Sequence, residues 1–284
     1  MSDRVRQRDD GDAHALRAGR NSRRRTPISM RLLPGLLGFV LAGALPDLSA
    51  DPQILRSGPA AVALVELFTS EGCSSCPPAE RWLGALRSDA GLWREFVPVA
   101  FHVNYWDHLG WRDALASKAF TARQRRYAAA WGAASVYTPG FVRNGAEWRP
   151  GGASPVGSTP AVADAGILTL SWDAATRTGT VTFLPGNGAQ AQRKWEVTVA
   201  LLGSGIVSTV RSGENAGREL RHDFVALQLA TVELTPQPDA PGTATGKVTL
   251  AAGPNLATTR RALAAWVALR GELTPLQTVG GWIE

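Results

Sequence analysis

The feature that most constrains the fold is a pair of cysteines, Cys73 and Cys76, separated by Ser74 and Ser75. They are the only cysteines in the 284 residues. The preceding residues 61–68 are apolar and β-inclined, which predicts a strand. Apolar side chains then recur at helical spacing from Ala79 onward, which predicts an amphipathic helix. The cysteines are therefore expected at a strand-to-helix turn.

This position suits reactive thiols. A helix N-terminus favours negative charge, and the second sulfur of a Cys-x-x-Cys pair stabilises the thiolate of the first. A disulfide that closes so small a loop constrains the unfolded chain little, so redox chemistry or metal binding explains the pair better than a structural staple does. The staple remains an alternative. We predict that Cys73 is an exposed nucleophile and that Cys76 resolves the mixed disulfide.

The first 50 residues have the pattern of an export leader. Arg31 is followed by an uncharged apolar stretch over residues 32–45, too short to span a bilayer comfortably. Leu48-Ser49-Ala50 offers a small residue for cleavage. Met30 is one of two methionines, and a true start there would give a compact signal peptide.

A twin-arginine signal at Arg23-Arg24-Arg25 and an uncleaved anchor are the alternatives for this leader. Residues 1–50 contain nine arginines and five aspartates, so they carry most of the net charge of +6 and leave +2 for residues 51–284. A nearly neutral mature chain lacks the basic character of a nucleic-acid-binding protein. We predict a periplasmic or secreted protein with no nucleic-acid partner and no membrane association after cleavage.

The mature chain begins with a mixture of strands and helices. Residues 95–103 are almost continuously apolar, which predicts a central strand covered on both faces. Ser117 is a candidate N-cap for a helix that ends at Gly132. We expect residues 55–166 to form one α/β domain.

The end of this predicted domain contains a hairpin and a short helix. A strand is expected after Pro139, and Asn144-Gly145 predicts the hairpin turn that follows it. Thr159-Pro160 has the pattern of an N-cap and a first helical residue, and Gly166 ends that short helix.

Beyond Gly166 apolar and polar residues alternate. Short alternating runs are separated by turns rich in glycine and proline, which predicts antiparallel strands. The predicted strands lie at residues 168–172, 181–183, 195–201, 206–210, 224–229, 247–250 and 263–269. We expect residues 167–284 to form an antiparallel all-β sandwich domain.

Three features of the first half resemble the thioredoxin superfamily. Cys73 and Cys76 lie between strand and helix, Glu66 lies in the preceding strand where thioredoxins carry a buried acid, and Thr138-Pro139 precedes a strand as the superfamily's cis-proline segment does. The resemblance implies a thioredoxin-like α/β domain. Glu66 is seven positions before Cys73, one more than the usual spacing, which leaves its role in proton transfer open.

Most of the chain after residue 55 resembles a narrower family, the exported bacterial proteins known as domain of unknown function 1223. The runs that carry this resemblance are Val65–Ser70, Cys73–Ala79, Phe101–Val103, Tyr105–Asp107, Gly110-Trp111, Thr121–Gln124, Val136–Pro139 and Gly213–His222. The family name implies no established substrate.

The resemblance assigns roles to residues beyond the cysteines. Glu66 is a candidate buried acid that accepts a proton from Cys76 through water, or else a solvated strand-end glutamate. Pro139 is expected to have a cis bond and to lie against the cysteines, with a trans turn proline as the alternative. The extended edge beside it would pair with a substrate peptide. The candidate substrate-binding residues are Thr138, Tyr137 and Trp106.

Two rival functions remain. The first is a copper or zinc chaperone or sensor that binds metal through Cys73, Cys76 and His102, with His108 as another possible ligand. A hydrogen-bonded core histidine is the alternative for His102. The second rival is a non-enzymatic binding module. Residues 213–222 either pack against the first domain, bind a ligand or form a solvated hairpin.

The sequence therefore predicts a thioredoxin-like α/β domain followed by a β-sandwich. The predicted activity is thiol–disulfide exchange with an extracytoplasmic protein that carries thiols or a disulfide. The catalytic candidates are Cys73, Cys76, Glu66 and Pro139, and no organic cofactor is expected.

Overall fold

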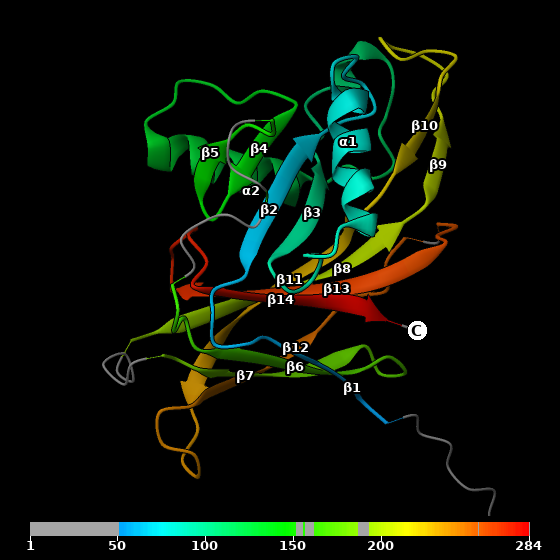
Figure 1. Cartoon of the computed structure of the whole chain (residues 1–284). Helices are drawn as coiled ribbons and strands as arrows, with labels where there is room; N and C mark the ends of the chain where they lie inside the picture. Colours follow the sequence, from blue (N-terminus) through cyan, green and yellow to red (C-terminus); the bar gives the residue numbers. More distant parts are fainter. Residues whose placement is uncertain (1–50, 152–155, 157–161, 187–192, 255, 284) are drawn as a thin grey trace, which may run out of the picture. The chain divides into compact units, whose positions relative to one another are not determined.

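The computed structural model describes residues 51–151, 156, 162–186, 193–254 and 256–283, which belong to one unit of the chain. Figure 1 shows the arrangement of their helices and strands. Two predicted features lie outside the described residues, the leader over residues 1–50 and the short helix at Thr159-Pro160. Among the described residues, no helix is long and apolar enough to cross a membrane.

The strand before the cysteines is β2 (Ala63–Thr69). It pairs in parallel with β3 (Phe96–His102) and antiparallel with β4 (Gly140–Arg143). Every residue of β2 and β3 is buried, as expected for strands covered on both faces. Asn144 and Gly145, both with positive φ, turn the chain into β5 (Ala146–Trp148). Both predicted strands and the predicted hairpin are confirmed.

The two predicted helices that fall within the described residues are also confirmed. α1 (Cys76–Ala85) begins at the second cysteine and continues into a short 3-10 turn. α2 (Lys118–Trp131) begins after Ser117, whose side chain accepts a hydrogen bond from the N–H of Ala119. It ends at Gly132, whose φ is +66°. Glycine adopts this left-handed conformation at little steric cost because it has no side chain.

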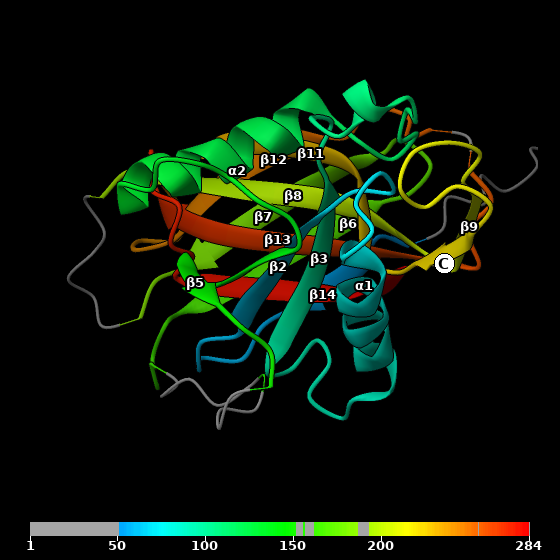
Figure 2. The same ribbon diagram turned by 90° about the horizontal axis from the view of Figure 1, so that it is seen from above.

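The helices cover opposite faces of β2 and β3. Successive side chains of a strand point to opposite faces, so Leu67 and Phe68 belong to different parts of the core. Leu67 packs in one apolar cluster with Leu83 of α1, whereas Phe68 packs in another with Tyr127 of α2. Figure 2 shows α1 and α2 on the two sides of these strands.

The second half consists of strands among the described residues. They are β6 (Ile167–Asp173), β7 (Thr178–Leu184), β8 (Trp195–Ser204), β9 (Ile206–Thr209), β10 (Glu219–His222), β11 (Val225–Pro236), β12 (Ala244–Thr249), β13 (Arg260–Leu269) and β14 (Gln277–Ile283). The seven predicted strands are confirmed within this set. β10, β14 and the N-terminal β1 (Gln53–Arg56) were not predicted.

The predicted fold class, a thioredoxin-like α/β domain followed by a separate sandwich, is wrong. β3 pairs in parallel with the start of β11 through Ala100 and Val225, so the sheet of the first half continues into the second. The described residues form one sheet of twelve strands with the order β1-β6-β7-β12-β11-β3-β2-β4-β5, to which β8, β13 and β14 are joined through β11. Only β9 and β10 form a separate two-stranded sheet there.

Strand β11 makes this continuity possible. Its first residue, Val225, pairs with β3 on one edge and with β8 on the other. Near the end of β11, where β3 no longer pairs with it, Thr235 and Pro236 pair with β12. A bulge between Ala226 and Gln228 bends the strand between these pairings.

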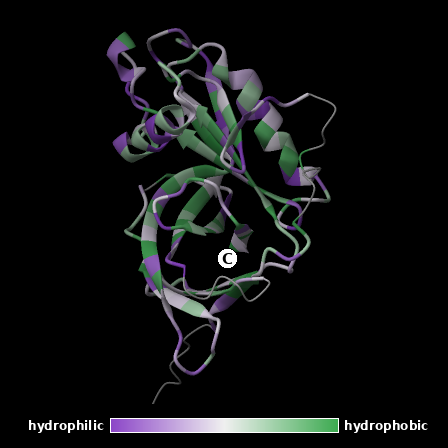
Figure 3. Ribbon diagram, turned by 90° about the vertical axis from the view of Figure 1, so that its left-hand side faces the viewer, coloured by the Kyte–Doolittle hydropathy of each residue, from purple (hydrophilic) through white to green (hydrophobic). Residues whose placement is uncertain are grey.

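The apolar core is likewise shared by both halves. Leu67 and Leu83 belong to the same cluster as Leu168, Val199 and Leu263. Figure 3 shows the hydrophobic residues concentrated on the strands. Separate domains would each have a core of their own, so the shared cluster is further evidence against a separate sandwich domain.

Candidate functional site

Cys73 and Cys76 form a disulfide in the turn from β2 to α1. The predicted strand-to-helix position is confirmed, because Cys76 is the first residue of α1. The predicted exposure is wrong for this oxidised conformation. Both cysteines have an exposed fraction of 0%, whereas Ser74 and Ser75 between them are exposed.

The Thr138-Pro139 segment lies beside Cys73. Its peptide bond is cis, as predicted. The Sγ atom of Cys73 is 3.8 Å from the carbonyl oxygen of Thr138. Trp106 donates from its indole Nε1 to the hydroxyl of Thr138 at 2.8 Å. The structure therefore brings three predicted site residues, Cys73, Pro139 and Trp106, to one place through Thr138.

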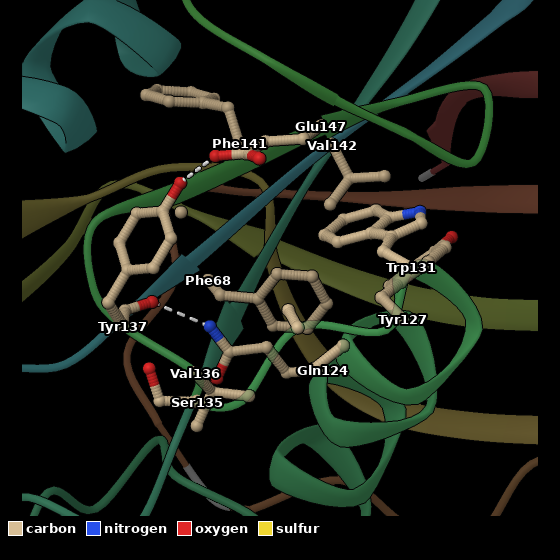
Figure 4. A pocket seen from close by; sticks show the side chains of 13 residues that line it. Phe68, Gln124, Tyr127, Trp131, Ser135, Val136, Tyr137, Phe141, Val142 and Glu147 are labelled. Carbon is tan, nitrogen blue, oxygen red and sulfur yellow. Dashed lines mark hydrogen bonds between the residues drawn. The ribbon is translucent and has the colours of Figure 1, made fainter.

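Tyr137, the residue before this segment, lines a pocket (Figure 4). Its side chain is 48% exposed, and its phenol donates a hydrogen bond to Glu147. Its carbonyl accepts a hydrogen bond of 2.6 Å from the side-chain amide of Gln124. The pocket is lined mostly by apolar groups, among them Phe68, Trp131, Val136, Phe141 and Val142. This apolar pocket lies next to Tyr137, the residue before Thr138.

The connection between β9 and β10, residues 210–218, covers the cysteine turn, and we call it the Asn215 loop. Asn215 is fully buried. Its side-chain amide donates to the carbonyl oxygens of Glu71 and Cys73, both at 2.9 Å. Two backbone acceptors at the start of the cysteine turn are thus held by one side chain from the second half of the chain.

Two further contacts hold the Asn215 loop in place. The carboxylate of Glu214 accepts a hydrogen bond of 2.9 Å from the backbone N–H of Ser74, and the contact with Ser74 lowers the pKa of Glu214. Ser212 donates from its hydroxyl to the carbonyl of Gly110 at 2.6 Å. Of the three possibilities considered for residues 213–222, the structure shows the packing against the first half of the chain.

Glu66 lies on the face of β2 that α2 covers. Its carboxylate accepts a hydrogen bond of 2.6 Å from Nε of Arg123 and a second from the phenol of Tyr127. Arg123 also donates to the Tyr127 hydroxyl at 3.1 Å. Cys76 begins α1, which covers the opposite face, so these contacts give no support to the predicted proton transfer between Glu66 and Cys76.

A second group of buried charges lies on the α1 side. His222, at the end of β10, has its Nδ1 against Glu80 of α1 and its Nε2 3.3 Å from Glu71. Burial alone would lower the pKa of His222, but Glu80 and Glu71 outweigh burial and raise it to about 10. Burial likewise opposes the charged form of Glu80, and His222 reverses this, so the pKa of Glu80 is lowered.

His102, at the end of β3, belongs to the same group. Its ring is 5.0 Å from the His222 ring, between centroids. Its Nδ1 lies 2.7 Å from Oδ2 of Asp113. Burial acts to lower the pKa of His102, but Asp113 raises it overall; by the same pairing the pKa of Asp113 is lowered against its own burial.

Sequence reasoning missed most of this group. For His102 the two interpretations were a metal ligand beside Cys73 and Cys76 and a hydrogen-bonded core histidine, and the structure shows a buried histidine bonded to Asp113. The group of described residues that could hold a metal ion joins His102 to Glu80 and His222, without the cysteines. The local sequence offers one signal for Glu80, which follows Cys76 by one helical turn in α1. Nothing near His222 in the sequence indicates its partners, because they come from distant segments.

The comparisons with known proteins show the family of this chain. A family model described as "Protein of unknown function (DUF1223)" matches residues 64–268. The chain belongs to this family. The match extends from β2 to β13, so the DUF1223 region includes the cysteine turn, the Asn215 loop and both histidines of the buried group.

Two solved structures are similar to this DUF1223 protein. Protein AGR_C_4864 from Agrobacterium tumefaciens is 23% identical, with a TM-score of 0.50, and the match covers 78% of this chain and 94% of that one. HBP35 of Porphyromonas gingivalis is 15% identical, with a TM-score of 0.55, and the match covers 80% of this chain and 76% of that one. At these identities the similarity concerns the fold alone. No curated protein matches the sequence.

Proposed function

We propose that this DUF1223 protein is an exported thiol–disulfide oxidoreductase that acts on other proteins. The observation that carries the proposal is the Cys73–Cys76 disulfide at the N-terminus of α1, with Cys73 Sγ 3.8 Å from the carbonyl oxygen of Thr138. A disulfide across so few residues adds little stability through chain entropy. A helix N-terminus stabilises the thiolate that forms when the disulfide opens.

The exchange proceeds through a mixed disulfide. In the reduced protein, the Cys73 thiolate attacks one sulfur of a client disulfide, and the other client sulfur leaves as a thiolate. The Cys76 thiolate then attacks the Cys73 sulfur, which re-forms the Cys73–Cys76 disulfide and releases the second client thiolate. The client gains two electrons from the two cysteines, and the two thiol protons pass to the client thiolates. The reverse sequence oxidises a client dithiol.

A client reaches the sulfurs only when the Asn215 loop moves aside. Both cysteines are buried in the oxidised state, and Asn215 holds the backbone carbonyls of Cys73 and of Glu71 just before it. The loop is attached there by a small number of hydrogen bonds, each of which contributes about 0.5–1.5 kcal/mol. Opening of this cover therefore limits the rate of exchange in our proposal.

The client is an extracytoplasmic protein with an extended segment at the reactive disulfide or dithiol. This segment would lie along Thr138 and Trp106, beside Cys73, and pair with exposed backbone as peptides do at open edges. An apolar client side chain would enter the pocket at Tyr137. The proposal includes no organic cofactor.

We further infer that this local arrangement is related to the active site of the thioredoxin superfamily. The support is limited to the Cys-x-x-Cys turn after a buried strand and the neighbouring Thr138-Pro139 segment. Export rests on the leader pattern of residues 1–50. N-terminal sequencing of the protein from its own cells tests export, since processing near residue 51 is expected and an intact N-terminus in the cytoplasmic fraction would contradict it.

The test of the activity uses the purified protein with insulin as model disulfide. Reduced wild-type protein should accelerate insulin reduction, Cys73→Ser should abolish this, and Cys76→Ser should accumulate a mixed disulfide that is visible on non-reducing gels. Ser74→Ala is the control, because this exposed residue contributes no thiol. Asn215→Ala gives a second variant with a loosened cover. Absence of insulin reduction and of mixed disulfides in both the normal and the Asn215→Ala background would overturn the proposal.

A further inference from the structure

Three buried side chains from distant parts of the chain converge on the α1 side of β3. Glu80 comes from α1, His102 from the end of β3 and His222 from the end of β10. One potential ligand atom from each lies within 4.8 Å of the other two. We propose that these residues bind a divalent transition-metal ion of the zinc class. This proposal is independent of the thiol chemistry.

Each side chain has one atom that would coordinate the ion. The Nδ1 of His102 is bonded to Asp113, which leaves Nε2. One oxygen of Glu80 accepts a hydrogen bond of 2.6 Å from the hydroxyl of Thr69, which leaves Oε2. In the structure this oxygen and Nδ1 of His222 are hydrogen-bonded to each other, and the ion would replace that contact. The ligand set is therefore Glu80 Oε2, His102 Nε2 and His222 Nδ1.

The Nε2 atom of His102 gives independent support. His102 is fully buried, and this nitrogen has no hydrogen-bond partner among the described residues. An unpaired polar atom in the interior is unfavourable, and native structures rarely leave one without a role. Coordination of a metal ion would supply the missing partner.

The residues around the three ligands form the support that metal-bound side chains usually have. A ligating histidine commonly directs its second nitrogen to a carboxylate, which fixes the ring. Asp113 does this for His102 at 2.7 Å, and Glu71 lies 3.3 Å from Nε2 of His222. Trp111 holds the other oxygen of Glu71 at 2.6 Å.

The chemistry of the ligands selects the ion. Two imidazole nitrogens with one carboxylate oxygen suit Zn²⁺ and its neighbours, whereas Mg²⁺ and Ca²⁺ prefer oxygen ligands and Cu⁺ prefers sulfur. Charge agrees with this choice, because the buried carboxylates of Glu71, Glu80 and Asp113 outnumber the two histidines. A divalent cation offsets that excess when both imidazoles are neutral.

The test measures metal in protein whose Cys73–Cys76 disulfide is intact, so that thiolates cannot bind it. The full chain is unfolded, refolded with excess Zn²⁺ or with a chelator, dialysed, and analysed by elemental mass spectrometry. We expect about one Zn²⁺ per chain after refolding with zinc. Co²⁺ in place of Zn²⁺ should give visible d–d bands without a thiolate charge-transfer band.

Variants assign the site. His222→Gln and the isosteric Glu80→Gln should lose the stoichiometric ion, and Asp113→Asn should weaken binding about 10–100-fold, as loss of an outer-shell carboxylate does. His108→Gln is the matched control, since His108 is the exposed histidine among the described residues. A double Cys73→Ser, Cys76→Ser variant should keep the ion, which separates this proposal from the proposed function.

Three results would overturn the proposal. They are wild-type protein that retains no metal, Glu80→Gln protein that folds with its circular dichroism unchanged and retains the full amount, and loss of the metal in the double cysteine variant. Glu80→Gln preserves the shape of the side chain and is expected to fold. The experiment therefore still decides the proposal if His222→Gln fails to fold.

Discussion

Two clusters of buried charge lie on opposite faces of β2 and β3, and they differ in how completely their atoms are paired. On the α2 face, Glu66, Arg123 and Tyr127 bond to one another. Arg123 also lies over the rings of Phe101 and Trp266 at 5.6 and 5.0 Å. We call this group the α2 cluster.

On the α1 face, Glu80, His102 and His222 with Glu71 and Asp113 form what we call the α1 cluster. Unlike the α2 cluster, it leaves Nε2 of His102 without a hydrogen-bond partner within the described part of the chain, and likewise Nε2 of His222 and Oε1 of Glu71 by hydrogen-bond geometry. Burial is equally deep in the two clusters. Burial of charge therefore does not by itself indicate a functional site, whereas incomplete pairing does.

The largest expected effect is on the α2 cluster. Glu66→Gln leaves the buried guanidinium of Arg123 without its counter-charge, so we expect a loss of about 3–5 kcal/mol in the free energy of unfolding, measured by urea denaturation. The folded variant should keep its rate of insulin reduction, because the role of Glu66 is to pair with Arg123 in the core.

A second variant checks the cause of that loss. Replacing both partners, as Glu66→Gln with Arg123→Met, removes the unpaired charge and should recover part of the stability. The opposite result is a Glu66→Gln variant that unfolds at the wild-type urea concentration but no longer reduces insulin. That result would assign Glu66 to proton transfer and would give the α2 cluster a functional role in place of a structural one.

The next effect is the pH dependence of the free energy of unfolding, measured in chelator-treated protein, which we expect to come from the α1 cluster. The pKa of His222 is raised from 6.5 to about 10 by Glu80 and Glu71 against burial, so its stabilisation is complete below pH 6.5 and is lost as the pH rises through about 10. Glu80 and Asp113 have lowered pKa values, so their stabilisation is present above 4.5 and 3.8 and is lost at more acidic pH.

Stability should therefore be greatest between about pH 4.5 and 6.5 and fall by roughly 2–4 kcal/mol by pH 10, measured by urea denaturation at each pH. His222→Gln should lack the part of the alkaline loss that His222 contributes, while the part from His102, whose pKa Asp113 also raises, remains. Zinc-loaded protein should lack both parts, because coordination keeps the imidazoles neutral. An alkaline loss of unchanged size in His222→Gln would assign it to groups other than His222.

The same contrast explains which parts were predictable from the sequence. β2, β3, α1 and α2 were found because their apolar periods are local. β10 was missed because its four residues are mostly charged or polar, and β14 because Gly280-Gly281 interrupts its apolar pattern. The continuous sheet was missed because the pairing of β3 with β11 joins residues far apart in sequence and leaves no local period.

In the candidate site, too, only the features with a local sequence pattern were predictable. The Cys73–Cys76 pair was found from its local spacing, and the neighbouring Thr138-Pro139 segment from the resemblance to the thioredoxin superfamily. For Glu66 the sequence left a buried acid and a solvated strand-end glutamate open, because a strand residue's face, and not its distance along the chain from Cys73, decides what it contacts. His222 could not be linked to Glu80 before the fold was known, because the Asn215 loop and β10 come from the second half of the chain.

The smallest expected effect concerns the cover that separates the α1 face from solvent. Asn215→Ala removes two hydrogen bonds to the cysteine turn, to the carbonyls of Glu71 and Cys73, so opening should become easier by about 1–2 kcal/mol. That change corresponds to a roughly tenfold faster reduction of the Cys73–Cys76 disulfide by dithiothreitol, followed by mass spectrometry after alkylation.

Glu214→Gln is the matched control for this variant, because Glu214 contacts Ser74 from an exposed position of the same loop and its loss should change the rate only about twofold. Equal rates for Asn215→Ala and wild type would mean that the sulfurs are reached by another route. Faster reduction in Asn215→Ala with unchanged urea stability would instead show that the loop opens locally, without unfolding either buried cluster.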